Sequence, residues 1–165
     1  MLKLLGSLCV VSGGALAWYF QRAERRRERN TRLDFQRAFR RMSEEVRMAR
    51  TPLPVLLRAL AGDCGEPAAV FFEAVSRAAA GGEDLPKVWR ERAEDLPLRE
   101  GDKSAVSALA GELQGDEEKV CKAISHVSYT LANSAGEAER TRPEEEKRAA
   151  ALWFSAAALL VILLI

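Results

Sequence analysis

The chain has 165 residues, of which 48% are hydrophobic and 30% charged, a composition that fits a folded, non-repetitive protein of one domain with accessory segments. Its net charge of +1 conceals a division, because residues 1–50 hold 12 Lys/Arg against 5 Asp/Glu whereas residues 51–148 hold 13 against 19. The three cysteines lie far apart with no CxxC or CxxH pair, which disfavours both a disulfide framework and a zinc site.

The first predicted element is an apolar segment, residues 4–20, without a single charge. It ends in Trp18 and Tyr19, residue types that favour the lipid headgroup boundary, and it predicts a short transmembrane helix. A cleavable signal peptide is the alternative, because Lys3 gives a positive start and residues 15–17 have the small-x-small form of a cleavage site.

An arginine-rich stretch follows this segment directly. Residues 22–32 hold six arginines against two glutamates, a net charge of +4, and the positive-inside rule keeps them in the cytoplasm while the N-terminus crosses the membrane. Nucleic-acid binding is disfavoured, because acidic rather than aromatic residues alternate with the arginines and an apolar segment adjoins them. The arginines are instead expected to lie near the phosphate groups of anionic lipids.

A long helix is predicted to continue from the first span. Phe35, Phe39, Met42, Val46 and Ala49 are spaced by four, three, four and three residues, which places them in one stripe. We therefore expect the first span to run straight into this helix.

Four short helices and a second long one are predicted to follow. Thr51 caps the first of these with Pro52 in its opening turn, glycine and proline residues separate the next two, Asp102 caps a fourth, and the last restarts at Gly115. The predicted inward-facing residues are Leu53, Leu56, Leu57, Leu60, Phe71, Ala74, Val75, Ala78, Leu85, Val88, Trp89, Leu96, Val106, Leu109, Leu113, Val120, Ile124, Val127 and Leu131. Since no alternating β-branched run occurs, the predicted fold is all-α, a compact six-helix bundle whose long helices continue into N- and C-terminal transmembrane helices.

A second apolar segment closes the chain. Residues 149–165 carry no charge and no polar face, with Trp153 near their start, so they predict a second span rather than a core helix. The predicted organisation is a transmembrane helix over 1–21, a cytoplasmic helical bundle over 22–147 and a transmembrane helix over 148–165. The predicted membrane-interface residues are Trp18, Tyr19, Arg22, Arg25, Arg26, Arg27, Arg29 and Trp153.

Residues that could carry chemistry are few. His126 lies five positions from Cys121 on one predicted helix, so the two side chains point about 140° apart and do not form a nucleophile–base pair. The "GDKS" at 101–104 lacks the glycine that a phosphate loop needs before its lysine. No catalytic residue, cofactor, metal or small-molecule substrate is predicted, and Asp116, Glu117 and Glu118 are read as a partner-binding surface.

Several stretches resemble one known family. The opening "MLKLLG", the "TPLPVLLRAL" of 51–60 and the closing "LLVILLI", supported by "PAAVFFEAV" at 67–75, are similar to the stage III sporulation protein AB family of endospore-forming bacteria. The resemblance implies a non-enzymatic mother-cell membrane protein in the assembly that connects to the forespore, with a cytoplasmic domain similar to the platform proteins of type II secretion and type IV pilus machines.

The same resemblance implies the partners. They would be the stage III sporulation protein AA ATPase and the other membrane components of that assembly, with the protein located in the mother-cell membrane around the forespore. The acidic balance of residues 51–148 would suit a basic face on the ATPase. The alternative interpretation is a generic membrane-anchored adaptor of the same topology and a different partner.

Overall fold

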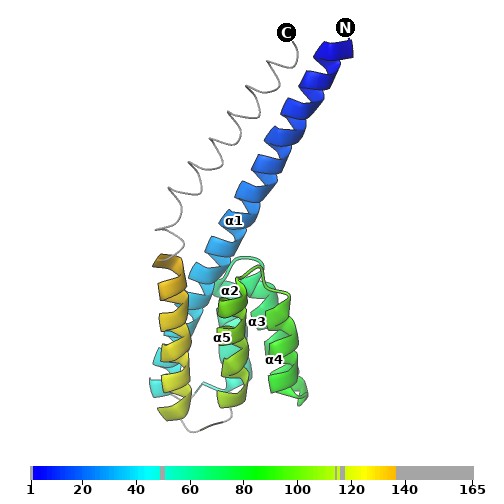
Figure 1. The fold of residues 1–165 in the computed structure, drawn as a ribbon. Coiled ribbons are helices and arrows are strands. Elements are labelled where there is room, and N and C mark those ends of the chain that lie inside the picture. The colour runs from blue at the N-terminus through cyan, green and yellow to red at the C-terminus, as the bar shows by residue number, and fades with distance from the viewer. Residues whose placement is uncertain (1, 49–50, 114, 116–117, 137–165) are drawn as a thin grey trace. The chain divides into compact units, whose positions relative to one another are not determined.

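The computed structural model describes residues 2–48, 51–113, 115 and 118–136. These residues form six helices and no strand, which confirms the predicted all-α class (Figure 1). The helices are α1 (Leu2–Met48), α2 (Leu53–Asp63), α3 (Ala68–Gly81), α4 (Leu85–Glu94), α5 (Glu100–Glu112) and an unlabelled last helix over 118–136. Residues 24–135 form one compact unit, and the first 23 residues belong to another.

The two predicted transmembrane spans are less well supported than the helical bundle. The first apolar segment is helical and continuous with the arginine stretch, as expected. Among the described residues, however, no helix combines the length and the hydropathy that crossing a bilayer requires. The second predicted span, 148–165, lies outside the described residues.

Two helix boundaries follow directly from local chemistry. Gly82 ends α3 in the left-handed conformation, with φ of 73°, a value that glycine adopts without a Cβ clash. Asp84 begins α4, because its carboxylate accepts a hydrogen bond from the Lys87 N–H at 3.2 Å. The break that glycine predicted after α3 is therefore confirmed.

The predicted start of α2 is wrong in detail. Pro52 rather than Thr51 occupies the capping position, and no side chain caps the helix there. The Thr51 hydroxyl instead donates to the Glu45 carboxylate at 3.1 Å. The charged acceptor on α1 thus orients this hydroxyl.

An aromatic cluster forms the centre of the bundle. Phe35 on α1 packs against Phe71 and Phe72 on α3 with ring centroids 5.2 and 5.1 Å apart, and Phe71 packs edge-to-face on Trp89 of α4 at 5.0 Å. The Trp89 indole N–H donates to the Val106 carbonyl of α5 at 2.8 Å. One buried cluster therefore joins α1, α3, α4 and α5, and it satisfies its one polar group.

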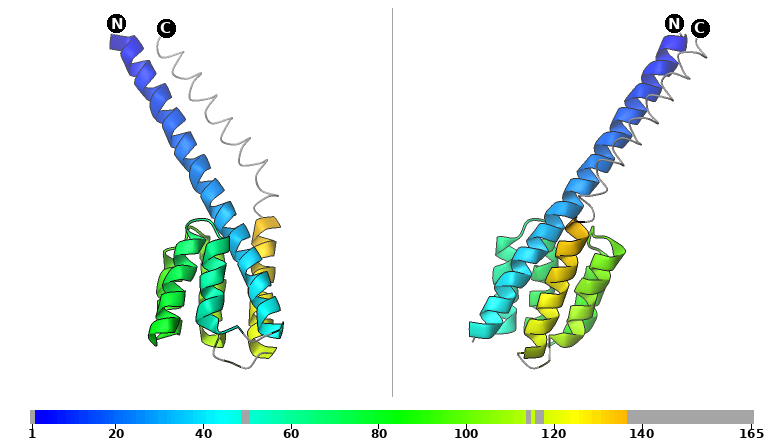
Figure 2. Two further views of the ribbon diagram at one scale, coloured as in Figure 1. Left: turned by 180° about the vertical axis from the view of Figure 1, so that it is seen from behind. Right: turned by 60° about the vertical axis from the view of Figure 1, so that its left-hand side comes forward.

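The predicted core is largely confirmed. All of the listed inward-facing residues are buried except Leu53, Ala74, Val88 and Leu113, which are half-buried. Val120, Ile124, Val127 and Leu131 bring the last helix into the same hydrophobic cluster. That helix runs beside α5, and α4 also packs on α5 (Figure 2).

Candidate partner-binding groove

The structure describes most of the predicted membrane-interface residues. Trp18 and Tyr19 are 52% and 65% exposed on α1, and the Arg22 guanidinium lies 5.0 Å from the centroid of the Trp18 ring. This cation–π contact keeps a charge beside an aromatic side chain, and the membrane-interface role of these residues stays a prediction. Four further arginines on α1 are also exposed, namely Arg25, Arg26, Arg27 and Arg29. Trp153 lies outside the described residues.

The predicted acidic surface is only partly described. Glu118 is exposed at the start of the last helix, whereas Asp116 and Glu117 lie outside the described residues. Glu118 is not among the residues that line the groove between α5 and the last helix. The role of these three carboxylates stays a prediction.

An ion network with the buried pair Arg32 and Asp102 at its centre joins α1 to α5, and the sequence did not indicate it. Arg32 is 4% exposed, its Nε donates to Asp102 Oδ2 at 2.9 Å, and its Nη2 donates to Glu28 Oε1 at 2.5 Å. The same Glu28 oxygen lies 3.2 Å from Nε of Arg99, the residue before α5. Two cations and two carboxylates therefore alternate across the contact between these helices.

The prediction that Asp102 caps α5 is consequently wrong. Asp102 is the third residue of the helix and 1% exposed, while Arg99 holds the capping position and no side chain caps the helix there. The carboxylate instead accepts a hydrogen bond from the Arg32 guanidinium of α1, which brings two opposite charges together. The i, i+4 pair of Glu28 and Arg32 could have been read from the sequence, whereas the partner 70 residues away could not.

Asp34 organises the loop between α2 and α3. Its Oδ2 accepts from the Gly65 N–H at 3.2 Å, and its Oδ1 accepts from Arg37 at 2.6 Å. Cys64 sits beside it, with Sγ 3.9 Å from the Asp34 carbonyl oxygen. Burial, aided by the Asp34 charge, raises the pKa of the Cys64 thiol to about 11, so very little reactive thiolate forms at neutral pH.

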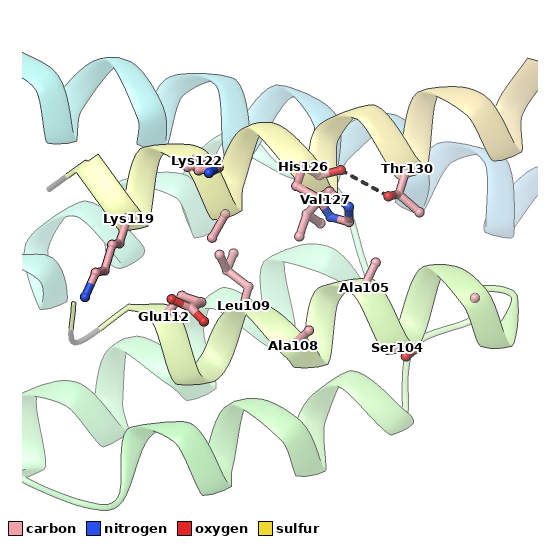
Figure 3. A pocket seen from close by; sticks show the side chains of 12 residues that line it. Ser104, Ala105, Ala108, Leu109, Glu112, Lys119, Lys122, His126, Val127 and Thr130 are labelled. Carbon is pink, nitrogen blue, oxygen red and sulfur yellow. Dashed lines mark hydrogen bonds between the residues drawn. The ribbon is translucent and has the colours of Figure 1, made fainter. Parts of the chain in front are cut away.

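A groove of about 610 Å³ lies between α5 and the last helix (Figure 3). The two helices run antiparallel along it, with Lys119 and Glu112 at one end and Thr130 and Ser104 at the other. From α5 the lining residues are Gly101, Ser104, Ala105, Ala108, Leu109 and Glu112. From the last helix they are Lys119, Lys122, Ala123, His126, Val127 and Thr130.

The groove has an apolar floor and a polar rim. Leu109 and Val127 are buried at its centre, with Ala105 and Ala123 half-buried beside them. Lys119, Lys122 and His126 are exposed along one side. Such a surface suits recognition of another molecule.

The described residues offer few groups for nucleophilic catalysis or metal binding. Cys121 is buried while His126 is exposed, so these two side chains are not brought together. In the part of the chain that the structure describes, no group of three or more His, Cys, Asp or Glu side chains is placed to hold a metal ion.

One comparison with known proteins identifies a family. The family described as Stage III sporulation protein AB matches residues 3–165. A solved structure titled "Stage III sporulation protein AB (SpoIIIAB)" superposes with a TM-score of 0.58 at 20% identity, covering 71% of this chain and 94% of that one. At that identity the likeness is evidence for the fold. Among curated proteins, none matches this chain.

Proposed function

Since the chain belongs to the stage III sporulation protein AB family, we propose that it is a non-enzymatic platform component of the membrane assembly between mother cell and forespore. A role in sporulation follows from family membership. Within that role, the helical bundle binds a partner protein and holds it at the membrane.

The family match over residues 3–165 is the observation that carries this proposal, because it includes the bundle and both apolar segments. The surface of the bundle adds support, since its groove offers a partner an apolar floor with a charged rim. The partner proposed from the family resemblance is the stage III sporulation protein AA ATPase, with the other membrane components of the same assembly.

Membrane attachment is proposed to come from the apolar segments at both ends of the sequence. The exposed arginines after residue 21 support a cytoplasmic side for the bundle, because moving several guanidinium groups through hydrocarbon is costly. Intact mass of the purified protein separates a retained first segment from a cleaved signal peptide. Extraction that requires detergent supports attachment, and release by high-salt washing contradicts it.

Orientation needs a suitable reporter. Cys64 has a raised pKa and Cys121 is 7% exposed, so these two of the three native thiols would react slowly on either side of a membrane. An Ala80→Cys variant places a thiol at an exposed position on α3. An impermeant reagent should modify this thiol only after spheroplasts are lysed, and modification before lysis would invert the proposed orientation.

Deletion of the gene tests the function itself. The proposal expects loss of heat-resistant spores with normal vegetative growth, and co-purification of the protein with the ATPase during sporulation. A generic membrane adaptor, the second candidate, would instead show a vegetative defect or a partner unrelated to sporulation. A neighbouring reading frame that encodes a secretion-type ATPase would favour the first candidate.

A further inference from the structure

We propose that the groove between α5 and the last helix receives one amphipathic helix of a partner protein, with apolar side chains along its centre and carboxylates along its edge. The inference deepens the proposed function and rests on it, because it says where and by what chemistry a platform protein would engage its partner. It assigns the groove a ligand class, an acidic helical segment.

The lining residues form a groove long enough to receive a helix. On α5 they fall at 101, 104, 105, 108, 109 and 112, and on the last helix at 119, 122, 123, 126, 127 and 130. Both sets follow steps of three, one, three, one and three, the stripe that one face of an α-helix presents to a neighbouring helix. Two such stripes side by side form a trough of about three turns, roughly 17 Å long, that a third helix would fill.

The α5 side of the groove permits close approach. Gly101, Ser104 and Ala108 are exposed and small, so they let the backbone of an incoming helix approach α5 closely. A Cβ placed on Gly101 would meet nothing within 4 Å, so packing inside the chain does not require glycine there. The open space above these residues is therefore available to another molecule.

Charge on the opposite side selects the partner. Lys119 and Lys122 are exposed, and neither forms an ion pair within the described residues. Glu112 is the one carboxylate among the lining residues, so the rim carries an excess of positive charge. Complementarity therefore favours carboxylates on the partner, which fix its orientation while the apolar floor supplies most of the affinity.

A labelled synthetic peptide tests the proposal on the full chain purified in non-ionic detergent. The peptide has about 18 residues, enough for a stable helix, with leucine at helical spacing and glutamate on both flanks; its twin carries lysine in place of glutamate. Fluorescence anisotropy should detect binding of the glutamate peptide and little of the lysine peptide. Added salt should weaken the binding.

Two groove variants and two matched controls locate the site. Ala108→Trp fills the trough and should weaken binding at least tenfold, whereas Ala80→Trp, at an exposed alanine of α3, should not change it. Lys119→Glu with Lys122→Glu should weaken binding about tenfold and admit the lysine peptide. The control of equal charge change, Arg58→Glu with Lys87→Glu, alters exposed residues of α2 and α4 and should bind like wild type.

Several outcomes overturn the inference. Equal binding of both peptides, absence of glutamate-peptide binding, or wild-type affinity in both groove variants would each reject an acidic helix as occupant. A dimer in sedimentation that Ala108→Trp abolishes would identify a second copy of the chain instead. Binding to anionic vesicles that only the Lys119/Lys122 double variant loses would identify lipid. A failed peptide assay beside an intact sporulation requirement would reject the groove and leave the proposed function standing.

Discussion

Replacing Asp102 with alanine should destabilise the bundle far more than replacing any exposed carboxylate. The Asp102 side chain is 1% exposed and the Arg32 side chain 5%, so the pair is shielded from water. Removing one member of a buried pair costs about 3–5 kcal/mol, because the remaining charge stays buried without its partner. Arg32 would keep Glu28 as an acceptor at 2.5 Å, so we expect a loss near the lower end, about 3 kcal/mol.

The reverse result is expected when both charges are removed. Arg32→Met combined with Asp102→Leu replaces the pair with apolar groups, so the double variant should lie within about 1 kcal/mol of wild type or above it in stability. The two substitutions should therefore be strongly non-additive. Equal, additive losses would mean that packing around the side chains, and not their charges, accounts for the effect.

Urea unfolding of the full chain, followed by far-ultraviolet circular dichroism, measures these differences. The matched control is Glu73→Ala, which removes an exposed pair with Arg77 whose side chains are 63% and 69% exposed and 3.9 Å apart. That control should cost less than about 0.5 kcal/mol. If Asp102→Ala costs no more than Glu73→Ala, the assignment of a buried stabilising network is refuted.

Three further predictions address the thiol, the core and a turn. Cys64 should react with an uncharged thiol reagent about ten times faster for each pH unit between about pH 8 and 10, because its pKa is raised to about 11 and only the thiolate reacts; a free-cysteine rate at pH 8 in the folded chain would contradict this. Trp89→Phe should lower the unfolding free energy by about 1–3 kcal/mol through loss of the bond to the Val106 carbonyl, and an unchanged urea midpoint would show that this bond contributes nothing net. Gly82→Ala should lower the free energy of unfolding by about 1 kcal/mol, because φ at this position is 73°. Gly62→Ala within α2 should leave stability equal or higher, because a Cβ there meets nothing within 4 Å. Similar effects of the two substitutions would refute the backbone argument.

Helix content and core membership were largely predictable because they depend on local spacing. Phe35, Phe39 and Met42 follow one another at intervals of four and three, and burying one face of the helix forces them inward. Phe72 escaped the prediction although it is fully buried, since a helix enclosed by several neighbours buries more than one stripe. Hydrophobic periodicity therefore identifies the main buried face of a helix, but not a second face that further neighbours bury.

The polar contacts were much less predictable. The local pattern predicts Asp102 as a helix cap, and only the approach of Arg32 from another helix gives it a buried partner. Thr51 likewise bonds to Glu45 rather than to the backbone. Local rules assign such side chains to the nearest backbone N–H, while the fold offers charged partners that the sequence does not place nearby.

The groove was missed for a related reason. Each of its walls is an ordinary helical stripe, and the α5 stripe contains glycine, serine and alanine rather than large apolar residues. A pattern search for hydrophobic residues therefore passes over Gly101, Ser104 and Ala108. The groove exists only because the fold sets this stripe beside the one that contains Lys119 and Lys122.

Spore formation in the native host tests the account most directly. A deletion strain is complemented with the wild-type gene, with the Lys119→Glu and Lys122→Glu double variant, or with the Arg58→Glu and Lys87→Glu control, and heat-resistant spores are counted. The account predicts full rescue by wild type and control and a severe defect with the groove variant at equal protein levels. A deletion strain that forms heat-resistant spores at the normal frequency would contradict the central claim.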